Sequence, residues 1–113
     1  MISNTLMNER RRDRLRKAVK KHQKTLDQAK SVMTDLILIE LKVGLQFAEF
    51  ARDSFFSKST SAGRRQQDYA VRAYQAVEKF LPRSAPTTEQ RTLIEKQLAD
   101  LKTAISDLES LSK

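Results

Sequence analysis

The sequence contains no cysteine and no tryptophan, and it has only two glycines and two prolines among 113 residues. Without cysteine, a disulfide framework and a thiolate metal site are both excluded. A chain of many short strands needs glycine or proline at most of its turns, and four such residues are too few. The composition therefore predicts one all-α domain, residues 1–113, made of a few long helices.

Long apolar runs are also missing. The most apolar stretch, LILI at 36–39, is bounded by Asp35 and Glu40 and is far short of the ~20 residues that span a bilayer. The start, MISNTLMNERRR, lacks the apolar run that follows the positive charge of a signal peptide. We therefore expect a cytoplasmic protein with no membrane span.

Acidic side chains are scarce in the first thirty residues. Ten Lys and Arg stand there against three Asp and Glu, which gives +7 of the total net charge of +8. The sequence thus predicts a basic amphipathic arm, residues 1–35, joined to a nearly neutral body, residues 36–113, that holds a helical hairpin and a C-terminal heptad helix.

Apolar side chains in the arm recur at alternating steps of four and three, which places them along one side of a helix. We call this set the seam: Leu15, Val19, His22, Leu26, Ala29 and Met33. Because no glycine or proline precedes Gly44, we expect one helix over residues 5–57. The alternative is a break near 31–34, where Ser31 and Thr34 are cap-like residues, giving an up-down four-helix bundle.

Two further helices are expected, over 64–81 and 87–111, separated from the first helix and from each other by a loop at 57–63 and by PRSAP. Thr87 and Gln90 have the spacing of a capping box. After residue 36 the apolar face of the first helix broadens, which predicts burial on more than one side, Val43 and Phe50 included. Small residues on both partners, such as Gly44 and Ala73, predict a close helix approach in a bundle of three long helices with an extended first helix.

Five basic side chains follow the same helical spacing on another side of the arm: Arg10, Arg14, Lys17, Lys21 and Lys24. A continuous cationic stripe of this kind suits the phosphates of a nucleic acid. It is also what a solvated helix face looks like, since Lys and Arg are good helix formers. The arm has no aromatic residue, which removes base stacking and weakens the further alternative of an anionic lipid surface.

The sequence offers no candidate catalytic residues. His22 is the only histidine, its seam position predicts a half-buried packing residue, and the Glu-x-x-His spacing of di-iron bundles is absent because position 19 is valine. Glu40, in the most apolar stretch, is expected to extend its carboxylate to solvent or to pair near Arg72 or Lys42, rather than to act as an acid or base. We therefore expect no enzyme, no cofactor and no metal.

The hairpin region resembles a known helical motif. Gly44 and Phe47, followed by Ala70, Tyr74 and Pro82, look like the small, aromatic and proline positions of a tetratricopeptide repeat. With GLQFAEFA (44–51), AVRAYQAVEKFL (70–81) and the last helix, residues 36–111 are similar to small uncharacterised bacterial all-helical proteins that have a tetratricopeptide-like hairpin. This resemblance implies a helical hairpin and no established activity.

The leading functional hypothesis is a non-enzymatic interaction or scaffold protein. In a three-helix fold the seam lacks a partner within the chain, which predicts a homodimer through parallel or antiparallel pairing of the arms, alongside an unidentified protein partner. The alternative hypothesis is a nucleic-acid-binding protein that uses the cationic stripe for phosphate contacts.

Overall fold

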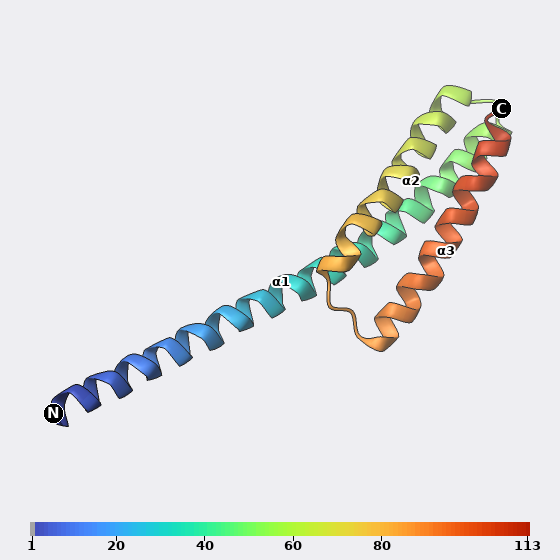
Figure 1. The fold of residues 1–113 in the computed structure, drawn as a ribbon. Coiled ribbons are helices and arrows are strands. Elements are labelled where there is room, and N and C mark those ends of the chain that lie inside the picture. Colours follow the sequence, from blue (N-terminus) through green and yellow to red (C-terminus); the bar gives the residue numbers. More distant parts are fainter. Residues whose placement is uncertain (1) are drawn as a thin grey trace.

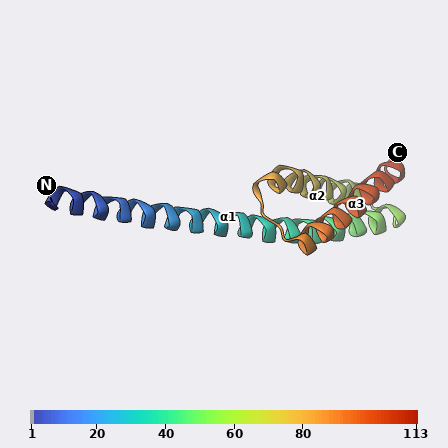
Figure 2. The same cartoon turned by 60° about the horizontal axis from the view of Figure 1, so that its bottom comes forward.

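The computed structural model describes the backbone of residues 2–113 and the side chains of residues 8–113. It has three α-helices, α1 (Ile2–Phe56), α2 (Thr60–Phe80) and α3 (Thr88–Leu111), with a short 3-10 helix, η1 (Leu81–Arg83), after α2. The second half of α1 packs side by side with α2 and α3, and its first half extends beyond them (Figures 1 and 2). The expected all-α bundle with an extended first helix is confirmed.

α1 runs without interruption through residues 31–34, so the four-helix alternative is wrong. Thr34, only 1% exposed, does not cap a helix end. Its hydroxyl donates to the Lys30 carbonyl oxygen at 3.1 Å and accepts from the Ala85 amide at 3.2 Å. Thr34 thereby fastens the connection between η1 and α3 to the side of α1 at the point where the bundle begins.

The predicted loop at 57–63 is wrong in extent, because α2 begins at Thr60 rather than at residue 64. Gly63 is buried inside the first turn of α2, and a Cβ atom there would lie 2.7 Å from Cε1 of Phe55. The glycine therefore lets α2 start directly against the end of α1. Three residues, 57–59, make the reversal, and Lys58 among them has a φ of 63°.

The core lies entirely in the second half of α1 and in the two helices packed on it. Its buried members are Ile37, Leu41, Ala48, Ala51, Ala70, Val77, Ile94, Leu101 and Leu108. The predicted close approach is present at Gly44, where an added Cβ would lie 2.9 Å from both Cβ of Ala73 and Cδ2 of Leu101. Burial of this side of α1 positions the rest of the helix and leaves its other faces free.

α3 begins with the predicted capping box. The Thr87 hydroxyl accepts from the Gln90 amide at 3.1 Å, and the Gln90 side-chain oxygen accepts from the Thr87 amide at 2.9 Å. These bonds satisfy two backbone donors that a helix start otherwise leaves unpaired. With α3 fixed, the molecule measures 84 × 26 × 16 Å, and its long dimension is that of α1, about 82 Å at 1.5 Å per residue.

Candidate interaction surface on the first helix

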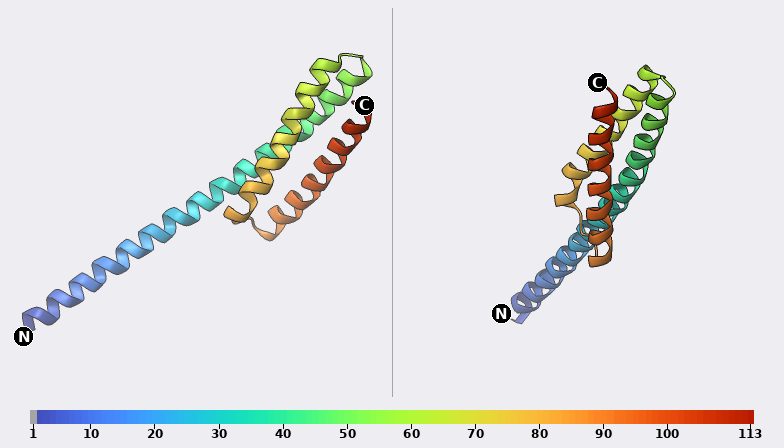
Figure 3. Two further views of the ribbon diagram at one scale, coloured as in Figure 1. Left: turned by 45° about the horizontal axis from the view of Figure 1, so that its top comes forward. Right: turned by 90° about the vertical axis from the view of Figure 1, so that its right-hand side faces the viewer.

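Residues 8–32 of the arm project from the bundle, and none of them is buried against another described part of the chain. Every residue from Asn8 to Val32 is exposed, and both views of Figure 3 show α2 and α3 confined to the other end of α1. A helix normally buries an apolar face against other elements of its fold. The apolar spacing in the exposed half of α1 therefore has no packing role within the described fold.

The seam faces solvent along nearly its whole length. Leu15, Val19 and Leu26 are between 42% and 67% exposed, His22 and Ala29 are exposed, and only Met33 is half-buried. The prediction that His22 is a half-buried packing residue is wrong, because nothing in the chain covers that side of the arm. The structure brings the six seam residues together as one line, as predicted, and supplies no contact for it.

A second exposed apolar line continues the seam onto the bundle. We call it the outer line: Val32, Leu36, Ile39, Val43 and Phe50, each between 37% and 57% exposed. The predicted burial of Val43 and Phe50 is wrong, because α2 and α3 cover only the sides of α1 that carry Ile37, Leu41 and Ala48. The outer line was missed from the sequence, although Leu36, Val43 and Phe50 continue the seven-residue spacing that starts at Leu15.

Aromatic contacts fix one end of the outer line against α2. The Phe47 ring lies 5.0 Å from the ring of Tyr69 and 6.3 Å, edge to face, from that of Phe50. Tyr69 is itself half exposed and has the Arg72 guanidinium 5.8 Å from its ring centre. Offset and edge-to-face ring pairs are favourable arrangements, so these contacts hold the exposed Phe50 and Tyr69 rings against Phe47.

The five candidate nucleic-acid contacts are all exposed on the arm. Among residues 8–113 the one ion pair joins Arg72 to Asp68, 2.9 Å apart on α2. The arm cations therefore have no carboxylate partner in the described part of the chain, and their charge is available to a polyanion or to an acidic surface. Glu40 is half-buried and forms no ion pair with Arg72 or Lys42, so of the two arrangements expected for it the paired one is absent.

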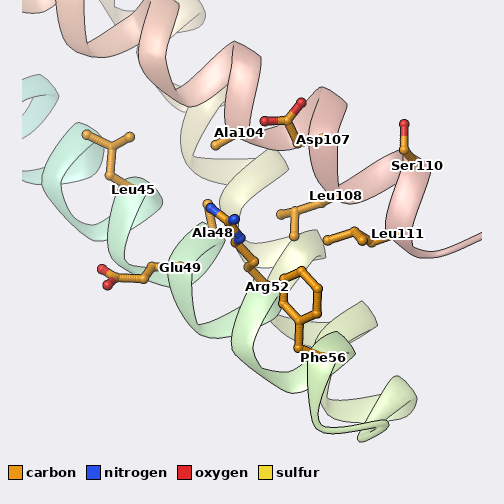
Figure 4. Close-up of a pocket in the computed structure, with 10 residues that line it drawn as sticks. All are labelled: Leu45, Ala48, Glu49, Arg52, Phe56, Ala104, Asp107, Leu108, Ser110 and Leu111. Carbon is orange, nitrogen blue, oxygen red and sulfur yellow. The ribbon is translucent and has the colours of Figure 1, made fainter.

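A shallow hollow of about 500 Å³ lies between the ends of α1 and α3 (Figure 4). Arg52 crosses it with its guanidinium 5.6 Å from the Phe56 ring centre, and Glu49 and Asp107 lie at its sides. Ser110 also lines the hollow, and no hydrogen bond joins its hydroxyl to Asp107 or Glu49. No buried side-chain polar atom among the described residues lacks a hydrogen-bond partner.

No set of three or more His, Asp or Glu side chains in residues 8–113 is grouped as a metal ion would require. Within the described part of the chain, no helix has a stretch long and apolar enough to cross a membrane.

The resemblance to a tetratricopeptide-like hairpin stays a prediction. No protein-family model, no curated protein and no solved structure matches this chain.

Proposed function

We propose that this chain is a non-enzymatic interaction protein that binds its protein partners, including copies of itself, through the exposed apolar lines of α1. The observation that carries this proposal is the position of the exposed large apolar side chains: of the twelve among residues 8–113, eight lie on the seam or the outer line. Single exposed apolar residues are ordinary on a protein surface, but a contiguous set marks an interaction site. We include in this proposal the cytoplasmic location that the sequence leads us to expect.

Light scattering with pull-down tests the proposal. A double variant, Leu15→Asp with Val19→Asp, is expected to lose self-association and partner capture, because two carboxylates would be buried unpaired in the contact. At a protein concentration low enough to keep the native chain monomeric, its thermal unfolding should match that of the native chain, since both side chains are exposed in the monomer and association would otherwise stabilise the native chain alone. The matched control is Lys17→Gln with Lys21→Gln, which leaves the seam intact. Unchanged capture by the aspartate variant, or reproducible turnover of a small molecule, would contradict the proposal.

A second candidate function, nucleic-acid binding, is supported by the exposed cationic stripe. If all five stripe residues each neutralise one phosphate, log affinity for duplex DNA should fall with log salt at a slope of about −4.5. Lys17→Gln with Lys21→Gln should reduce that slope by about two and weaken all sequences alike, because phosphate contacts do not read bases. Filter binding at several salt concentrations measures both. Affinity at ~0.15 M salt no tighter than that of an unrelated protein of similar charge would exclude this function.

A further inference from the structure

We propose that the partner of the seam is the outer line of a second copy of this chain, with the two α1 helices antiparallel. The inference rests on the self-association in the proposed function and specifies which surfaces meet and in which direction. In this pair the arm of each chain lies on the bundle of the other. Each bundle thereby gains a fourth helix, and neither seam is left exposed.

The spacing of the two lines carries the proposal. From Leu15 to Met33 the seam advances by steps of 4, 3, 4, 3 and 4 residues. Read backwards from Phe50 to Val32, with the exposed Gln46 completing the series, the outer line has the same steps of 4, 3, 4, 3 and 4. Two antiparallel helices therefore match these lines layer by layer if they wind around each other with the left-handed supercoil that a seven-residue spacing imposes, and side chains can then interdigitate along the pair.

The resulting layers place apolar side chains opposite each other. Leu15 lies level with Phe50 of the second copy, Leu26 with its Ile39, and Ala29 with its Leu36. The symmetry axis passes between Val32 and Met33, so each layer occurs twice. An isologous contact of this kind closes on itself and gives a dimer rather than a fibre. The two polar members, His22 and Gln46, fall in separate layers, opposite Val43 and Val19.

Charge favours this pairing over contact between the two arms. Arm-on-arm pairing, parallel or antiparallel, sets a segment of +7 against another of +7. Residues 31–56, which carry the outer line, hold four acidic and two basic side chains, a net charge of −2. One step beyond the apolar layers, Arg12 lies level with Asp53 of the second copy. Opposite charges thus face each other when the arm lies on the bundle of the second copy, whereas like charges face each other when arm lies on arm.

The contact is long enough for a stable dimer, and the fold leaves room for it. Residues 15–50 span about 53 Å of a helix about 10 Å wide, a footprint of roughly 500 Å² per chain before side chains interdigitate. A specific interface buries at least about 1,000 Å² in total over both partners, and two such footprints reach this lower bound. The outer line lies roughly 130° round α1 from the core residues at the helical period, so α2 and α3 do not obstruct it.

Disulfide trapping in the full chain tests the direction and register, because the native sequence has no cysteine. Val32→Cys lies beside the symmetry axis and should form a covalent dimer under mild oxidation, as the effective thiol concentration in such a pair reaches the millimolar range. At about 10 μM protein this corresponds to a rate about 100-fold above that of free collision. Ser31→Cys, at almost the same level but on another face, is the matched control and should cross-link only at the collision rate.

A second pair of variants distinguishes antiparallel from parallel contact. Leu15→Cys and Phe50→Cys should each remain uncross-linked alone and should cross-link when mixed, because Leu15 is about 50 Å from its own counterpart in the antiparallel pair. Cross-linking of Leu15→Cys with itself, in a chain that light scattering shows to be dimeric, would overturn the antiparallel register and leave the proposed function standing. A monomer at high micromolar concentration that still captures another protein through the seam would overturn the dimer altogether and leave standing only the binding of other proteins in the proposed function.

Discussion

Replacing Gly44 by leucine is expected to unfold the bundle or to lower its stability by about 3 kcal/mol or more, near the upper end of what overpacking costs. An added Cβ atom alone would lie 2.9 Å from Cβ of Ala73, which cannot move without its helix, and 2.9 Å from Cδ2 of Leu101. Three further carbon atoms would have to enter a site where Leu101 is fully buried. Urea unfolding followed by circular dichroism measures the loss as a lower midpoint at unchanged slope.

Smaller changes at the same contact distinguish overpacking from a general effect of the substitution. Gly44→Ala gains about 1 kcal/mol of helix propensity and is still expected to destabilise, because the methyl group meets Ala73. Ala73→Gly should relieve that clash, so the double variant should be more stable than the sum of the single changes predicts. Additive effects of Gly44→Ala and Ala73→Gly would contradict the close approach as the cause.

Hydrophobic spacing favoured three long helices in the observed order, although it left open a fourth helix made by a break near 31–34. Pro82 and the Thr87 capping box are local signals, and the helix ends beside them lie within a residue or two of the expected positions. The start of α2 was missed because serine, threonine and glycine at 57–63 read as a loop. The burial of Gly63 against Phe55, a contact between residues eight apart, makes that stretch helical, and no local pattern encodes it.

Of the candidate surface, the seam was predicted from the sequence and the outer line was not. The reason again is a contact that local spacing does not encode. A seven-residue spacing shows which side chains share a face of a helix, but not whether another part of the chain covers that face. Val43 and Phe50 fit a buried pattern as well as an exposed one. Only the positions of α2 and α3 decide between these, and they place Ile37 and Leu41 inside while leaving the outer line outside. The unbroken helix through Thr34 likewise depends on its contact with Ala85, 51 residues away.

The exposed arm leads to the last prediction, which concerns amide hydrogen exchange along α1. In the monomer, residues 8–32 are all exposed, and helices without packing partners are marginal in water. Their amides should therefore exchange with protection of about tenfold or less, while amides around Ile37 and Leu41 should exchange only through global unfolding. For a stability of at least about 5 kcal/mol, the protection of these core amides exceeds ~10³. Mass spectrometry of peptides from the two halves of α1 measures this contrast.

The same exchange measurement at several protein concentrations distinguishes an arm that is protected by itself from an arm that is protected by dimer contacts. In the antiparallel pair the arm is packed on the second copy, so protection of residues 15–30 should rise with concentration towards that of the bundle, following the dimer fraction. Peptides from α3 around Leu101, which is fully buried in the monomer, serve as the internal control and should change far less. Leu15→Asp with Val19→Asp should hold the arm at its low protection at every concentration, because charged side chains in the layers prevent pairing. Strong arm protection that does not depend on concentration would mean that the arm is stable by itself, and the unpartnered seam would then not drive association.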